Sequence, residues 1–150
     1  MSTIGPTSAA VPPERRDRTV AAVSGVLLLI GMPVGYFSGH TSTGEVIGFF
    51  VLTALSLALT AWLVLWLVPR ERAAGPERAT RTAMLLGVLA LLAIAFFWTG
   101  LPFPLGAGAI ALGLWLRERA AASGRHGKAT AVLSLGAFAE AASFVALLVG

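Results

Sequence analysis

The chain of 150 residues contains no cysteine, and this absence excludes disulfides, thiolate metal sites and a cysteine nucleophile. Charged residues are also scarce, because they make up 12% of the chain against roughly 25% in soluble proteins. Hydrophobic residues make up 57%. A soluble fold of this composition would have too few polar side chains to cover its surface. The long uncharged runs therefore predict an all-α membrane protein with several spans.

The chain has eleven basic and seven acidic residues, and all eleven basic residues fall in three short segments. These segments are residues 15–18, 70–81 and 117–128. Each segment lies beside an apolar run, so membrane topology explains the pI of about 11.1 better than nucleic-acid binding does. We expect no nucleic-acid partner, and we expect these segments to contact anionic lipid headgroups.

The apolar runs predict a bundle of about five transmembrane helices over residues 19–150, after a disordered cytoplasmic tail over residues 1–18. The expected spans are residues 19–39, 46–68, 82–98, 101–116 and 129–149. Because basic segments stay in the cytoplasm, an even number of spans should separate each from the next. The N-terminus should therefore lie inside the cell and the C-terminus outside, in a bacterial plasma membrane.

The connections between these spans are expected to be short. Pro69 should close the second span, and residues 70–81 and 117–128 should form charged loops. The fourth span is the weakest, because its twelve core residues, 105–116, would form only about 18 Å of helix. Residues 101–116 therefore either cross the bilayer fully or form a re-entrant segment.

Glu140 is the strongest candidate for a functional residue, because it is the only ionisable side chain deep within a predicted span. It shares a helical face with Ser143, and Thr53 and Ser56 share a face of the second span at a similar depth. We predict an intramembrane polar site from these four residues. The Glu140 carboxyl either has a function or serves packing alone, hydrogen-bonded to a hydroxyl or to the carbonyl that Pro33 frees on Leu29.

Small residues recur at helical spacing in two of the predicted spans. Such stripes let helix backbones approach closely in lipid. In the first span they pack against the second or fifth span, or they form a homodimer face. The predicted packing residues are Gly31, Gly35 and Gly39 in the first span, and Ala109 and Gly113 in the fourth.

The C-terminal third carries a pattern of glycine and arginine around a turn. It comprises Leu105-Gly106, residues 110–113, Arg117-Glu118-Arg119, residues 124–129, and Leu133 with Gly136. This pattern resembles the Gly/Arg-turn hairpin of small actinobacterial multi-pass membrane proteins that are grouped as domains of unknown function. The resemblance implies a membrane location and no particular activity.

No sequence motif indicates catalysis, since a phosphate-binding loop, an H-E-x-x-H motif and a G-x-S-x-G motif are all missing. We therefore predict no enzymatic activity, no metal and no cofactor. The leading hypothesis is a multi-pass plasma-membrane protein that acts as an assembly or accessory factor, as a homo-oligomer or with another membrane protein. The alternative is a small proton-coupled transporter or channel that uses Glu140.

Overall fold

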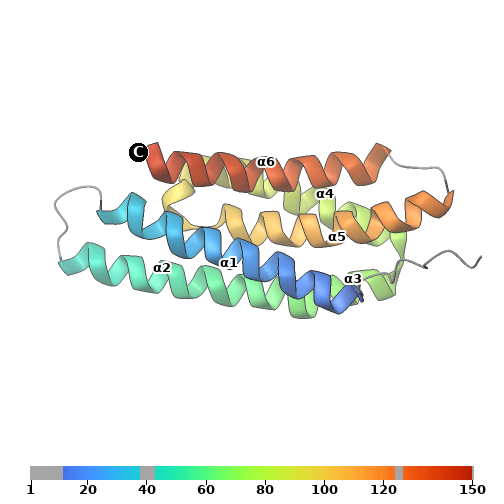
Figure 1. Cartoon of the computed structure of the whole chain (residues 1–150), viewed down its shortest axis with the longest axis horizontal. Helices are drawn as coiled ribbons and strands as arrows, with labels where there is room; N and C mark the ends of the chain where they lie inside the picture. The colour runs from blue at the N-terminus through green and yellow to red at the C-terminus, as the bar shows by residue number, and fades with distance from the viewer. Residues whose placement is uncertain (1–11, 38–42, 124–126, 150) are drawn as a thin grey trace, which may run out of the picture.

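The computed structural model describes residues 12–37, 43–123 and 127–149, and every element in this part of the chain is helical. Because α2, η1 and α3 follow one another without a break, and η2 continues α4, the elements form five rods (Figure 1). The predicted all-α fold with five long helices is therefore confirmed. The elements are α1 (Pro13–Phe37), α2 (Thr43–Trp62), the π-helix η1 (Leu63–Leu67), α3 (Val68–Ala74), α4 (Pro76–Ala93), the 3₁₀ helix η2 (Ile94–Thr99), α5 (Pro102–Ser123) and α6 (Gly127–Val149).

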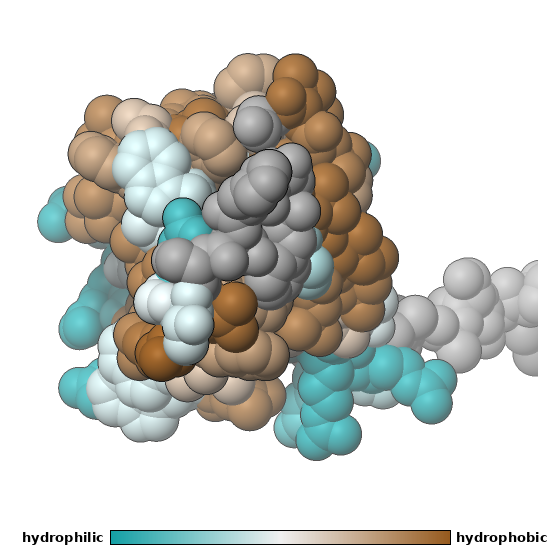
Figure 2. All heavy atoms as spheres, turned by 90° about the vertical axis from the view of Figure 1, so that its left-hand side faces the viewer, coloured by the Kyte–Doolittle hydropathy of each residue, from teal (hydrophilic) through white to brown (hydrophobic). Residues whose placement is uncertain are grey.

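Four of the five rods are long and apolar enough to cross a membrane by themselves. Their large apolar side chains point outwards, and Figure 2 shows the resulting apolar sides of the bundle. In water such a surface would aggregate, whereas lipid chains solvate it. The chain is thus built as an integral membrane protein. The four apolar segments are Glu14–Val34, Thr43–Ala74, Pro76–Thr99 and Gly127–Val149.

The rods alternate in direction along the chain, and the contacts between α1 and α6 agree with this order. Ser24 meets Glu140, and Gly31 meets Leu147, so a step of seven residues along α1 matches the same step along α6. The two helices are therefore parallel. The alternation brings the three basic segments to one end of the bundle, here named the basic end, while α6 finishes at the opposite end (Figure 1).

Helix α5 forms the centre of the bundle, in contact with α1, α2, α4 and α6. Between Pro102 and Gly113 every residue except Leu105 and Ile110 is buried. Among the described side chains of α5, none is a large apolar group exposed to the outside. Its 22 residues form about 33 Å of helix, so the short fourth span is longer than its apolar part suggests.

The beginning of α1 corrects the expected boundary of the N-terminal tail. The helix begins at Pro13, so residues 13–18 belong to the bundle, while residues 1–11 lie outside the described part. Proline suits the first position of a helix, because its missing N–H has no partner there in any case. The predicted disorder over residues 1–18 is therefore wrong for residues 13–18.

The expected loop over residues 70–81 is also wrong, because helix continues on both sides of Gly75. Pro69 does not end the second span: the N–H of Val68 reaches back to the carbonyl of Leu63, five residues earlier. This π-helical turn shifts the hydrogen bonds just before Pro69, which has no N–H to donate. The chain reverses at Gly75, whose φ of 107° is open to glycine and strained for other residues.

The third basic segment is helical over its first half. Helix α5 runs on to Ser123, although residues 117–128 were expected to form a loop. Arginine, glutamate and alanine are good helix formers, so the sequence from Arg117 onwards extends the helix beyond the apolar run. Helix α6 then begins at Gly127.

Candidate functional site

Glu140 lies inside the bundle, where its carboxyl accepts a hydrogen bond from α1. The hydroxyl of Ser24 donates to Oε1 of Glu140 over 2.6 Å, and both side chains are buried. This hydrogen bond joins the first and last helices at mid-depth. A hydroxyl partner is what the structural interpretation of Glu140 requires, and the sequence did not identify Ser24 as that partner.

Two glycines allow the carboxyl of Glu140 to lie between α5 and α6. A Cβ at Gly106 would lie 2.7 Å from Cγ of Glu140 and 3.2 Å from the carbonyl oxygen of Gly136. A Cβ at Gly136 would lie 3.0 Å from the carbonyl oxygen of Gly106. The two backbones are therefore in contact here, as small residues permit in membrane helices.

The other predicted polar residues are buried, but they do not assemble around Glu140 by hydrogen bonds. Ser56 donates to the carbonyl oxygen of Thr99 over 3.1 Å, whereas Glu140 accepts from Ser24. Within the described residues, the hydroxyls of Thr53 and Ser143 are buried and have no hydrogen-bond partner. The face predictions are confirmed, since Thr53 and Ser56 point inwards together, as do Glu140 and Ser143.

Three of the five predicted packing residues pack inside the chain, and the structure describes no contacts for the other two. A Cβ at Gly31 would lie 3.0 Å from Leu147, so this glycine packs against the fifth span, as one interpretation required. Ala109 and Gly113 of α5 are also internal, and Gly113 faces Leu133 of α6. No side-chain environment is described for Gly35, and Gly39 lies outside the described residues.

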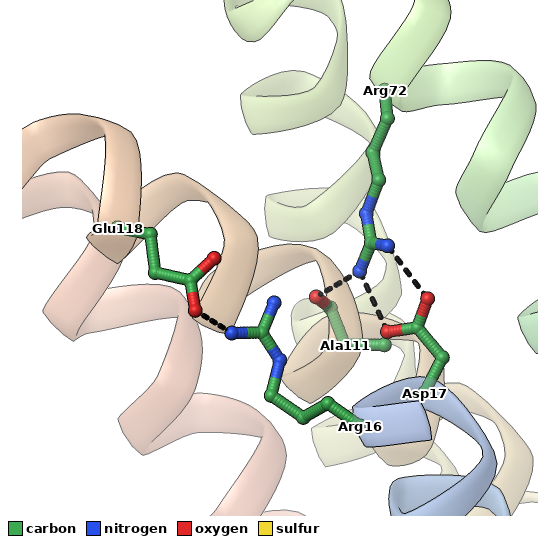
Figure 3. Close-up of polar contacts among 5 residues, drawn as sticks. All are labelled: Arg16, Asp17, Arg72, Ala111 and Glu118. Carbon is green, nitrogen blue, oxygen red and sulfur yellow. Dashed lines mark hydrogen bonds and ion pairs between the residues drawn. The ribbon is translucent and has the colours of Figure 1, made fainter. Parts of the chain in front are cut away.

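A buried ion pair at the basic end is the main feature that the sequence did not predict. Arg72 of α3 donates two hydrogen bonds to the carboxylate of Asp17 of α1, over 2.6 and 2.7 Å, and a third to the carbonyl oxygen of Ala111 over 3.0 Å. The side chains of Arg72 and Asp17 are only 12% and 8% exposed. Figure 3 shows this pair between the rods, with the neighbouring Arg16–Glu118 ion pair joining α1 to α5.

A second carboxylate is buried at the same end. Glu71 of α3 accepts hydrogen bonds from Arg78, over 3.2 Å, and from the hydroxyl of Thr82, over 2.9 Å. Both donors lie on α4, so these bonds hold α3 against α4 across the turn at Gly75. Together with the Asp17–Arg72 pair, they tie α1, α3, α4 and α5 into one polar layer.

A signal for part of this layer exists in the sequence. Asp17, Ser24 and Gly31 recur every seven residues, which places them on one face of α1. That face is buried at Asp17 and Ser24, and Gly31 packs on α6. Arg16 and Arg18 place Asp17 within a charged run, and such a run in the sequence does not indicate burial.

Two hollows are lined by described residues, and neither lining includes Glu140. One, of about 490 Å³, runs along α1 beside Arg15, Arg18 and Val23. The other, of about 860 Å³, lies at the basic end among α4, α5 and α6. The candidate polar site and these hollows are therefore separate features.

No family model, curated protein or solved structure matches this chain. The resemblance of the C-terminal third to small actinobacterial membrane proteins therefore stays a prediction.

Proposed function

We propose that this protein is a non-enzymatic assembly or accessory factor of the plasma membrane, acting through its lipid-facing helix surfaces and its basic end. The observation that carries the proposal is the enclosure of Glu140. Its carboxyl accepts a hydrogen bond from Ser24, and its side chain lies against Gly106, where α5 and α6 touch. A carboxyl held in this way by three helices stabilises the bundle, whereas a transport site must open to one side and then the other.

In this proposal the basic end faces the cytoplasm, as the positive-inside rule requires. The exposed apolar faces of the four outer rods then offer surfaces for a second copy or for another membrane protein. Packing between helices, rather than a hydrophobic driving force, would hold such a complex together in lipid.

A photo-crosslinking experiment in native membranes tests the assembly role directly. We expect a crosslinkable residue at exposed positions to join the chain to a discrete protein partner from at least one rod. The same residue at buried Ala139, next to exposed Phe138, should give no such product. Lipid adducts alone from every exposed position would contradict the proposal. The positions are Leu29, Leu55, Leu85 and Phe138, which are 51%, 61%, 64% and 63% exposed.

A second candidate function, proton-coupled transport through Glu140, is favoured by one specific observation. The hydroxyl of Ser143 lies one helical turn from Glu140, is fully buried and has no hydrogen-bond partner within the described residues. The hydroxyl of Thr53 on α2 is also buried and has no hydrogen-bond partner within the described residues. Buried hydroxyls without partners are places where water or a transported ion can bind.

A flux assay separates the two candidates. The parent and Glu140→Gln are reconstituted in proteoliposomes, and proton flux is followed with and without a pH gradient. The assembly role predicts the same background flux for both proteins and for empty vesicles. Proton flux in the parent that Glu140→Gln abolishes would establish transport and overturn the primary proposal.

A further inference from the structure

The cavity at the basic end has a floor and a rim of opposite character. Its volume is about 860 Å³, and it lies where α4 and α6 begin and α5 ends. Leu116, Ala120 and Ala129 line it and are buried. The rim carries exposed charged side chains, so the cavity joins an apolar interior to a charged surface.

The charges on the rim favour an anion. Arg81, Arg119 and Lys128 come from α4, α5 and α6 respectively, and Glu77 of α4 is the carboxylate among the lining residues. Three positive side chains and one negative side chain leave a net charge of +2. Since α4 and α6 both begin at this cavity, the partial positive charges of their N-termini add to this field.

Arg119 is oriented by an aromatic neighbour. Its guanidinium carbon lies 4.6 Å from the centre of the Trp115 ring, in a cation–π contact one turn along the same helix. Tryptophan is typical of the interface between lipid chains and headgroups. We therefore expect the cavity to lie at the depth of the phosphate groups of a leaflet.

We propose that this cavity binds a phosphate-bearing anion, and that the anion is the headgroup of an anionic phospholipid. The three cations contact the phosphate oxygens. The apolar floor favours a lipid over free phosphate, because it accommodates the start of an acyl chain. This site goes beyond the proposed function, and its lining does not include Glu140.

Native mass spectrometry of the detergent-solubilised protein tests the site by titration with phosphatidylglycerol and, separately, phosphatidylcholine. The variant Arg81→Gln/Arg119→Gln/Lys128→Gln should raise the Kd for phosphatidylglycerol about a hundredfold, since each basic residue near a phosphate is worth about fivefold in affinity. Glu77→Gln removes the repelling carboxylate and should lower the Kd about fivefold. Phosphatidylcholine should bind weakly to all variants, because its headgroup has no net charge.

The matched control removes three exposed basic residues of the same end that lie outside this lining, as Arg18→Gln/Arg70→Gln/Arg117→Gln. It should change the Kd by less than about fivefold. Equal losses in both triple variants would show diffuse attraction and overturn the site, as would equal Kd values for parent and Glu77→Gln. A titration with inorganic phosphate distinguishes the source: saturable binding that the cavity triple abolishes identifies free phosphate, and no binding identifies the lipid.

Discussion

Breaking the Asp17–Arg72 ion pair should destabilise the bundle more than any change to an exposed charge. In Asp17→Asn the side chain keeps its size, but the carboxylate that faces Arg72 becomes neutral. The guanidinium is then left buried without a countercharge, because the new amide oxygen and the carbonyl oxygen of Ala111 are both neutral acceptors. Removing one partner of a buried pair costs about 3–5 kcal/mol, because the other charge loses its compensation.

The magnitude follows from the geometry of this pair. Since Arg72 keeps its bond to Ala111, we take the lower end of the range, about 3 kcal/mol. For a chain of this size, each kcal/mol shifts the melting temperature by about 2–4 °C. Asp17→Asn should therefore lower the melting temperature by about 6–12 °C. The four tryptophans provide the fluorescence signal for a melting curve in detergent.

Glu118→Gln is the matched control for this experiment. Its carboxylate pairs with Arg16 at the same end, but the Glu118 side chain is 58% exposed. Only the Glu118 side of this pair is exposed, since the Arg16 side chain is 19% exposed. The cost should therefore lie near the upper end of the range for exposed pairs, about 1 kcal/mol, and the melting temperature should fall by no more than about 4 °C. Asp17→Asn/Arg72→Gln removes both buried charges and should cost less than the two single changes added together. A shift for Asp17→Asn as small as that for Glu118→Gln, or strictly additive single changes, would refute the reasoning.

Three further predictions follow from the packing and the threading of the helices. Gly106→Ala places a methyl group 2.7 Å from Cγ of Glu140 and should cost about 1–3 kcal/mol in thermal stability, whereas Gly48→Ala, with nothing within 4 Å, should be neutral or stabilising. A lower melting temperature for Gly48→Ala than for Gly106→Ala would contradict the close α5–α6 contact. Single cysteines at Thr43 and Ala74, exposed at opposite ends of one rod, should react with an impermeant reagent from opposite sides of the membrane, with only Thr43→Cys labelled in intact cells. Labelling of Ala74→Cys alone would reverse the orientation, and labelling of both from outside would reject the threading. Glu140→Gln keeps an oxygen that can accept from Ser24 and should melt within a few degrees of the parent, since membrane hydrogen bonds average about 0.6 kcal/mol. Glu140→Ala loses that acceptor and leaves a cavity beside Gly106, so its melting temperature should be clearly lower; equal values for the two variants would show that the carboxyl does not contribute to packing.

Much of the fold could be predicted because lipid imposes strict demands on sequence. A helix that faces lipid must be apolar over about 20 residues, so four of the rods appear in the sequence as long apolar runs. Helical spacing also predicts the inward face of α6 that carries Glu140 and Ser143, and both side chains are buried. Both inferences use the regular geometry of a single helix, and neither needs to know which helices are neighbours.

The partner of Glu140 could not be predicted on those grounds. The spacing of residues shows which face of a helix is buried, but it does not show which helix covers that face. Ser24 and Ser56 are both hydroxyl residues within apolar runs, and only the arrangement of rods decides between them. In the structure, Ser24 on α1 donates to Glu140, while Ser56 on α2 donates to the carbonyl oxygen of Thr99.

The charged segments differ from the prediction for a different physical reason. A charge beside an apolar run predicts the end of a membrane span, but helix formation tolerates arginine and glutamate well. Asp17 and Glu71 therefore stay within helices, where their neighbours bring Arg72 and Arg78 against them. Once each carboxylate has a guanidinium partner, its burial no longer leaves an isolated charge in a medium of low polarity.

Helix α5 shows why low apolarity does not mean a weak span. The outer rods bear the exposed large apolar side chains, while α5 is enclosed by them and lacks such groups among its described side chains. An enclosed helix needs small residues rather than large apolar ones, because its neighbours must approach its backbone, as α6 does at Gly106 and Gly113. Hydropathy therefore reports contact with lipid and not depth in the membrane. A short, glycine-rich and weakly apolar segment between stronger spans is thus the sequence pattern of a central helix, and the same reasoning predicts that lipid-facing substitutions on the outer rods are tolerated better than an added methyl group on α5.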